Sequence, residues 1–190
     1  MENIIKVINY PNLRIEKLKG KEVVKEMQKV RELMKMNMPN GYWWFSAGSA
    51  LGIVREPKLF IEHDTDIDLE VFVKKPYYVE FLKMTMKDYM LVREMYCGDR
   101  VMQLAYMNNE DIIIDFYFYY DKEKDFIVNH NDGGTLRVPK KYIENMEEVR
   151  GFVVPTPVKE YLKYRYGSDW ATPINNKKGW DYAGEALERK

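Results

Sequence analysis

The segment that most restricts the fold is DIIIDFYFYYD, residues 111–121. Its first half is apolar on both faces of an extended chain, which is typical of a strand buried in the middle of a sheet. One charged residue, Asp115, interrupts the run. A carboxylate among β-branched and aromatic side chains costs several kcal/mol unless it is compensated. Either a bound cation compensates Asp115, or Asp115 lies at a strand end and accepts hydrogen bonds from the backbone or a tyrosine.

Periodicity and turn signals predict the other elements. The expected helices cover 21–36, 49–56, 76–89 and the segment from Thr156-Pro157 to Gly167. The expected strands are 42–48, the part of 61–73 that follows its acidic residues, 90–97, 100–107, 111–120 and 151–155. Turn signals at 97–99 and 108–109 predict that three of these strands form an antiparallel meander. We interpret 129–138 as a turn-rich connection, and 168–190 as an aromatic loop before a short terminal helix.

Composition limits the class of protein. A chain of 190 residues fits a single domain over 1–190, with 1–41 as an N-terminal helical segment and 168–190 as a C-terminal tail. Thirty basic residues balance thirty acidic ones, so no nucleic-acid partner is expected. The single cysteine, Cys97, excludes an internal disulfide and a multi-cysteine zinc site. Because the chain has no transmembrane segment and no signal-peptide pattern, we expect a cytoplasmic protein.

A second informative segment is IEHDTDIDLEVFV, residues 61–73, in which acidic residues precede an apolar strand. Asp66 and Asp68 are separated by one residue, so in an extended chain both side chains point to the same face. Two carboxylates on one face can share a divalent cation. The alternative is a solvated acidic loop, which is common before strands.

Gly48 and Ser49 lie upstream, at a turn between an expected strand and an expected helix. Glycine permits close approach of the backbone, while the serine hydroxyl and the helix N-terminus supply hydrogen-bond donors to an anion. Asp66 and Asp68 on one strand and Asp115 on another supply oxygen ligands for a hard cation such as Mg²⁺. A phosphate on one side and a metal on the other is the arrangement of a phosphoryl-transfer site.

The segment AGSALGIVREPKLFIEHDTDIDLEVFV, residues 47–73, resembles the signature of the LicD and fukutin group. That signature is Gly-[Thr/Ser]-Leu-Leu-Gly-x-x-Arg followed by Trp-Asp-x-Asp-hydrophobic-Asp. The matching residues are Gly48, Ser49, Leu51, Gly52, Arg55, Asp64, Asp66, Ile67 and Asp68. Asp115-Phe116 resembles a later strand of the family, and VVPTPVKEYLKYRYGSDWATP, residues 153–173, resembles its closing element. The similarity spans about residues 42–173.

The resemblance implies a nucleotidyltransferase-like α/β (α+β) fold, in which helices flank a mixed β-sheet. It also implies an enzyme that transfers phosphocholine or a polyol phosphate from a CDP-linked donor to a glycan hydroxyl and releases CMP. The implied cofactor is Mg²⁺ or Mn²⁺. The implied partners are a CDP-linked or other nucleotide donor and a glycan or small-molecule acceptor.

The resemblance also assigns roles to individual residues. Asp66, Asp68 and Asp115 are the expected metal ligands and catalytic residues. The residues expected to bind the phosphate of the donor are Gly48, Ser49, Arg55 and Asp64. Arg55 pairs either with a phosphate oxygen or with Asp64, because a guanidinium fork suits both partners.

Two other functions stay open. The first is transfer of a nucleoside monophosphate from an NTP to a small molecule or a protein. In minimal nucleotidyltransferases the Gly-Ser turn and the aspartate pair lie closer together than Ser49 and Asp66 do here, which favours the CDP-linked donor. The second is a non-catalytic binding module that retains the fold. Three carboxylates in one pocket argue against this module, because unpaired charges destabilise a fold that makes no use of them.

Overall fold

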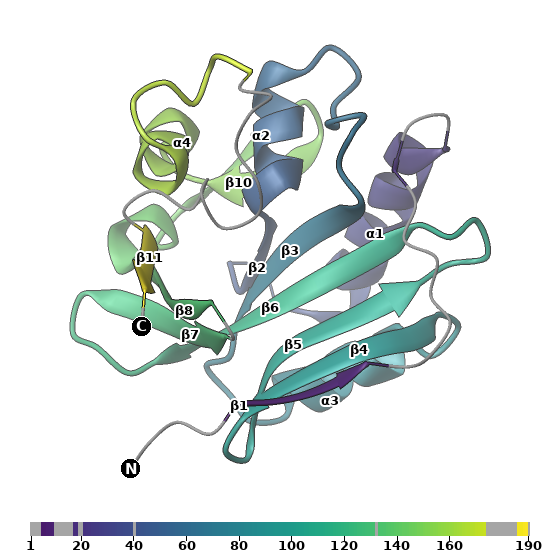
Figure 1. Ribbon diagram of the computed structural model, residues 1–190, viewed down its shortest axis with the longest axis vertical. Helices are drawn as coiled ribbons and strands as arrows, with labels where there is room; N and C mark the ends of the chain where they lie inside the picture. Colours follow the sequence, from purple (N-terminus) through teal and green to yellow (C-terminus); the bar gives the residue numbers. More distant parts are fainter. Residues whose placement is uncertain are drawn as a thin grey trace.

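One parallel pair of strands, β3 (Asp66–Phe72) and β6 (Ile113–Asp121), lies inside a sheet whose other pairings are antiparallel (Figure 1). The computed structural model describes residues 5–9, 17–18, 21–39, 41–131, 133–173 and 186–189. Within these residues, nine strands form this sheet in the order β1-β4-β5-β6-β7-β8-β11, with β3 paired to both β6 and β2.

The bounds of the other elements complete the description. The remaining strands are β1 (Ile5–Asn9), β2 (Trp43–Phe45), β4 (Met90–Cys97), β5 (Arg100–Met107), β7 (Phe126–Asn131), β8 (Gly134–Pro139), β9 (Met146–Val149), β10 (Phe152–Pro155) and β11 (Leu187–Arg189). The helices are α1 (Val23–Asn37), α2 (Ala47–Arg55), α3 (Tyr78–Thr85), α4 (Val158–Tyr166) and a 3₁₀ helix (Lys140–Tyr142).

Helices lie on both sides of the sheet. α1 and α3 pack against each other behind it in Figure 1, while α2 contacts β3 and α4. The separate hairpin of β9 and β10 contacts β2 and α4 through β10. The fold is therefore a mixed sheet flanked by helices, as the sequence predicts. Among the described residues, no helix combines the length and apolar character needed to cross a bilayer.

Several predicted elements are confirmed within a few residues. Helix α1 matches the helix expected over 21–36, and α2 matches the one expected over 49–56. The antiparallel meander of β4, β5 and β6 is also confirmed. β6 lies between β5 and β3, so it is the central strand that its two apolar faces indicate.

Two predictions are wrong. Residues 129–138 are not a turn-rich connection but belong to the hairpin of β7 and β8. The polar run around Asn129 concealed this strand: Asn129 is buried, and its amide nitrogen donates hydrogen bonds to the carbonyls of Met102 (2.7 Å) and Phe118 (2.9 Å). At the C-terminus, 187–189 form strand β11 on β8 rather than a helix, and most of the expected terminal loop lies outside the described residues.

The N-terminal range 1–41 also differs in part from its predicted helical character. It contains α1 as expected, but residues Ile5–Asn9 form strand β1, which pairs with β4. β1 therefore extends the sheet beyond the predicted meander.

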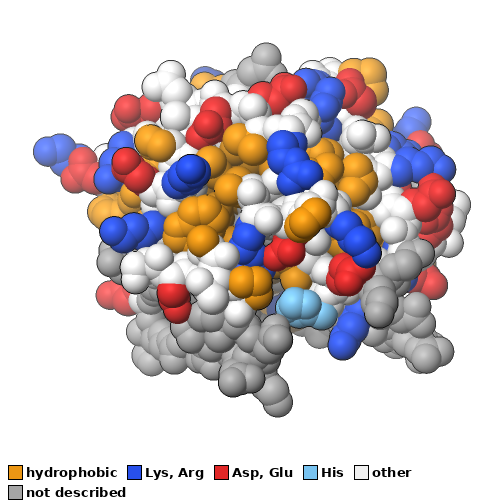
Figure 2. All heavy atoms as spheres, turned by 90° about the horizontal axis from the view of Figure 1, so that it is seen from above, with side chains coloured by type: hydrophobic (Ala, Val, Ile, Leu, Met, Phe, Trp, Pro, Cys, Tyr) orange, Lys and Arg blue, Asp and Glu red, His pale blue; other side chains and the backbone are white. Residues whose placement is uncertain are grey.

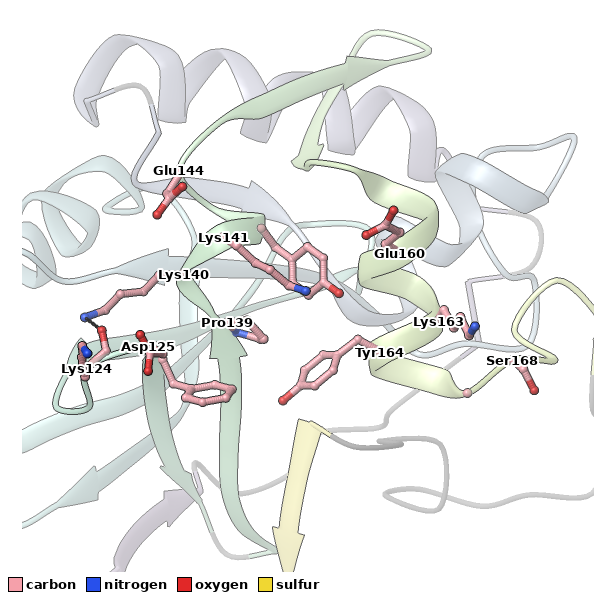
Figure 3. Close-up of a pocket in the computed structure, with 13 residues that line it drawn as sticks. Lys124, Asp125, Pro139, Lys140, Lys141, Glu144, Glu160, Lys163, Tyr164 and Ser168 are labelled. Carbon is pink, nitrogen blue, oxygen red and sulfur yellow. Dashed lines mark hydrogen bonds between the residues drawn. The ribbon is translucent and has the colours of Figure 1, made fainter.

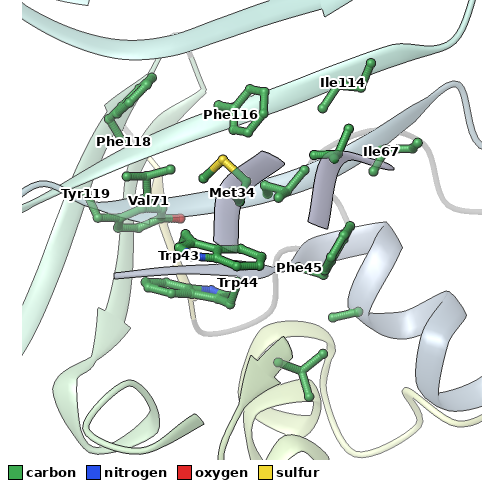
Figure 4. Close-up of a cluster of buried hydrophobic side chains, with 14 of the residues drawn as sticks. Met34, Trp43, Trp44, Phe45, Ile67, Val71, Ile114, Phe116, Phe118 and Tyr119 are labelled. Atoms are coloured by element: carbon green, nitrogen blue, oxygen red, sulfur yellow. The ribbon is translucent and has the colours of Figure 1, made fainter. Parts of the chain in front are cut away.

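Alternation along β3 and β6 separates an apolar face from a polar one. Ile67 and Val71 of β3 pack with Ile114, Phe116 and Phe118 of β6 in the core that Figure 4 shows. In a strand, the intervening residues point to the opposite face. The residues on that polar face are Asp66, Asp68, Glu70, Asp115, Tyr117 and Tyr119. The apolar face therefore anchors both strands, while the polar face is available for chemistry.

Gly52, one of the glycines of the sequence signature, lies at a close contact between α2 and Phe60. A Cβ atom at this position of α2 would lie 2.7 Å from the backbone Cα of Phe60. Backbone atoms cannot move aside as the end of a flexible side chain can. Gly52 therefore allows α2 to pack closely on the loop that leads to the acidic segment.

We predict that Gly52→Ala lowers the free energy of unfolding by about 1–3 kcal/mol, because the added methyl group overpacks the contact between α2 and Phe60. Denaturant unfolding measures the change. Glu80→Ala on the exposed side of α3 is the control, with an expected change within about 0.5 kcal/mol. An unconstrained helical glycine gains about 1 kcal/mol on replacement by alanine, so a more stable Gly52→Ala variant would contradict this packing.

Candidate functional site

Aspartates from two strands and a loop meet at the start of β3. One carboxylate oxygen from each of Asp64, Asp66 and Asp68 lies within 4.8 Å of the other two. Asp115 joins them from β6, because the parallel register pairs Asp115 with Asp68. We call these four residues the Asp cluster. The register thus brings together side chains that are nearly fifty positions apart in the sequence.

Asp115 provides the test of whether a cation fits. It is only 7% exposed, and its Oδ1 atom has no hydrogen-bond partner among the described residues. The positive charge of Arg93 acts on Asp115, but burial still raises the pKa of Asp115, so this charge does not offset the cost of a bare buried carboxylate oxygen beside three other carboxylates. Carboxylates are the ligands preferred by hard divalent cations such as Mg²⁺ and Mn²⁺. The Asp cluster therefore has the composition of a divalent metal site.

Burial and mutual repulsion raise the pKa values of the Asp cluster. Burial, followed by the charge of Asp66, raises the pKa of Asp64 to about 7. Burial, followed by the charge of Asp115, raises the pKa of Asp66 to about 7. Burial and the neighbouring carboxylates hold the pKa of Asp68 well above its usual range, and burial raises the pKa of Asp115. Without a cation, the cluster therefore retains protons near neutral pH.

The beginning of α2 holds Asp68 in place. The backbone N–H of Gly48 donates to Oδ2 of Asp68 at 3.0 Å, and the backbone N–H of Asp68 donates to Oγ of Ser49 at 2.9 Å. A Cβ atom at Gly48 would lie 2.2 Å from Oδ2 of Asp64. A side chain at Gly48 would displace this carboxylate, so the Gly-Ser pair and the aspartates form one unit.

Arg55 is not the partner of Asp64. Its Nε atom donates to Glu56 at 2.7 Å, and its Nη1 atom donates to the backbone carbonyl of Trp170 at 3.1 Å. Asp64 lies instead with Asp66 and close to Gly48. Of the two partners left open for Arg55, Asp64 is therefore not observed. Arg55 instead ties α2 to the segment after α4.

Residues that the sequence analysis overlooked lie beside the cluster. Glu70 continues the alternating row of Asp66 and Asp68 along β3, and it is completely buried. Arg165 of α4 is also buried, with its Nη1 atom 3.6 Å from Oε1 of Glu70. The period of two in the sequence could have revealed Glu70, because the row of acids continues past Asp68. No sequence signal places Arg165, since only tertiary packing brings α4 to β3.

A separate groove lies on the other side of α4 (Figure 3). It has a volume of about 1040 Å³ and lies between α4 and the segments that flank β7 and β8. Its lining combines aromatic rings, such as Tyr142 and Tyr164, with lysines and carboxylates. On the face of the molecule seen in Figure 2, basic and acidic side chains are interspersed. Lys140 is already occupied, since its Nζ atom contacts Asp121 and two backbone carbonyls.

Comparison with protein-family models gives a match over residues 40–159, to the family described as LicD/FKTN/FKRP, nucleotidyltransferase domain. The chain belongs to this family. The match includes the Asp cluster and α2, while most of α4 lies beyond it. Family membership supports a transferase of the phosphotransferase or nucleotidyltransferase type, with a nucleotide donor and an acceptor substrate.

A comparison with curated proteins gives no match. Among solved structures, one similar chain is described as the lincosamide antibiotic adenylyltransferase LnuA with lincomycin bound. It shares 15% sequence identity and a TM-score of 0.47, with 69% of this LicD-family chain and 77% of that chain covered.

We predict that the metal-free protein loses stability as the pH rises from about 4 to about 7. The folded pKa values of Asp64 and Asp66 are near 7, against 3.8 as the ordinary value. In this window the folded state binds more protons than the unfolded state, so the free energy of unfolding falls with rising pH. A bound cation removes this dependence, because it takes the place of the protons.

Thermal melts across this window, with a chelator and then with saturating Mg²⁺, measure the effect. The double variant Asp64→Asn, Asp66→Asn should show a flatter pH dependence in chelator, whereas Asp99→Asn on the exposed turn after β4 should follow the wild type. The same slope in the wild type and the double variant would show that the cluster is not its source.

Proposed function

We propose that the chain is a metal-dependent phosphotransferase that moves a phosphocholine or polyol-phosphate group from a CDP-linked donor to a glycan hydroxyl. The observation that carries the proposal is the convergence of four carboxylates beside the beginning of α2, within the matched family domain. In this proposal Asp66, Asp68 and Asp115 hold Mg²⁺ or Mn²⁺. The bound cation would neutralise the charge that develops on the transferred phosphate.

The chain's own residues perform the other steps. Where Asp115 does not bind the cation, its carboxylate can accept the proton of the attacking hydroxyl. Gly48 and Ser49 position Asp68 and present the N-terminal end of α2 to the donor phosphate. Asp64 completes the acidic side of the pocket. Arg55 would exchange Glu56 for a phosphate oxygen, a partner that its planar fork also suits.

The groove on the other side of α4 offers a place for the acceptor. Tyrosine rings pack on the apolar faces of sugars, and lysines and carboxylates bind their hydroxyl groups. Tyr164 and Ser168 line the groove, and Tyr166 between them is close enough to Asp68 for that charge to affect the pKa of the phenol.

We predict CMP release when the protein is incubated with Mg²⁺, a CDP-linked donor and an acceptor mixture. The donors to compare are CDP-choline, CDP-ribitol, CDP-glycerol and the four NTPs. Asp66→Asn and Asp68→Asn should each lower the rate by at least about 100-fold, because each removes charge stabilisation at the reacting phosphate. Asp99→Asn, an exposed aspartate outside the cluster, should retain the wild-type rate.

The outcomes separate the candidate functions. Pyrophosphate release from an NTP, with no turnover of a CDP-linked donor, would replace our proposal with nucleotidyl transfer. Wild-type turnover by Asp66→Asn would remove the Asp cluster from the mechanism. A wild-type protein that turns over no donor and gains no thermal stability from Mg²⁺ and nucleotide would favour a non-catalytic module.

A further inference from the structure

Glu70 already has hydrogen-bond donors besides Arg165. Trp44 Nε1 donates to it at 2.8 Å, the Tyr119 hydroxyl at 3.0 Å and the Tyr161 hydroxyl at 3.5 Å. These residues come from β2, β6 and α4, and both Glu70 and its donors are buried. Glu70 therefore does not need Arg165 to satisfy its carboxylate oxygens.

Arg165 has donor capacity that the protein does not use. Its side chain is 6% exposed, and its Nη1 atom has no hydrogen-bond partner among the described residues. The distance of 3.6 Å to Glu70 allows charge attraction but exceeds a normal hydrogen bond. A guanidinium stays protonated even when it is buried. A buried charge adds little to stability, because well-packed apolar residues serve equally well there, so Arg165 calls for a functional explanation.

The position of Arg165 supplies that explanation. Glu70 and Asp68 lie on the same face of β3, two residues apart, and the positive charge of Arg165 acts on both carboxylates. Four ionised carboxylates carry two negative charges more than one divalent cation neutralises, and Arg93, whose charge acts on Asp115, offsets only one of them. A nucleotide donor carries negative phosphates, so it meets repulsion at such a site unless a further positive charge lies nearby.

We propose that Arg165, held in place by Glu70, is the buried positive charge that attracts the donor's diphosphate to the Asp cluster. This inference rests on the proposed function, because it takes the Asp cluster as the site of a nucleotide donor. It adds a residue of α4 to donor binding, outside the sequence segments that carry the aspartates. Glu70 is the positioning residue of the pair, since it fixes the guanidinium without a direct contact to the donor.

The proposal predicts opposite effects on cation and anion binding. Arg165→Met removes a positive charge, so affinity for Mn²⁺ alone should stay the same or rise. Affinity for CDP in the presence of Mn²⁺ should fall by at least about 10-fold, the loss expected for a charged interaction of this kind. A purely structural Arg165 would instead weaken both, because loss of packing disturbs the whole cluster.

Isothermal titration of the full chain with Mn²⁺, and then with CDP at saturating Mn²⁺, makes this measurement without turnover. The double variant Glu70→Gln, Arg165→Met removes both charges of the pair and should show the same loss of CDP affinity, even if the single variant is unstable. Arg137 lies on β8 and pairs with Glu123. The Arg137→Met variant is the control and should bind both ligands as the wild type does.

Three results would overturn the proposal. CDP affinity unchanged in both Arg165→Met variants excludes the attraction. Parallel losses of Mn²⁺ and CDP affinity in folded variants assign Arg165 to structure alone. A wild type that binds neither Mn²⁺ nor CDP refutes the proposed function and this inference with it, whereas the first two results leave the proposed function intact.

Discussion

The parallel pairing of β3 with β6 is the constraint on which the rest of the structure depends. It sets Asp68 opposite Asp115 and, on the other face, Ile67 opposite Ile114. The apolar side chains form the core that fixes both strands, so the aspartates cannot move apart to relieve their repulsion. Burial, and then this repulsion, raise the pKa values of Asp66 and Asp68. Such a site lowers the stability of the metal-free fold and favours binding of a cation.

Each neighbouring element then has a role toward the same few carboxylates. α2 contributes Gly48, which leaves room for Asp64, and Ser49, which accepts the backbone N–H of Asp68. α4 contributes Arg165, which lies against Glu70 on the polar face of β3. Local backbone contacts therefore position the proposed metal ligands, while a distant helix supplies the positive charge. In our proposal, this division separates cation binding from anion binding, although both use one face of the sheet.

Prediction from the sequence succeeded where patterns were local and failed where long-range contacts decided. The apolar run of β6 and the period of α1 are properties of a few consecutive residues, so both elements were found. The strand that contains Asn129 was missed because carbonyls from two other strands satisfy its amide. Of the two partners left open for Arg55, Asp64 is not observed: Arg55 instead contacts the adjacent Glu56 and the carbonyl of Trp170, which lies far along the chain.

The sequence by itself determined strands β2–β6 and β10, the row of aspartates on one face of β3 and the family to which the chain belongs. Strand period and residue chemistry are sufficient for the strands and the row of aspartates, and the sequence signature in residues 47–73 is sufficient for the family. Each of these depends on neighbours along the chain. Only the tertiary structure decided that Asp115 stands beside Asp68, that Gly48 must lack a side chain and that Arg165 reaches Glu70. These contacts depend on register and helix packing, which arise from burial of the whole apolar core rather than from any single segment.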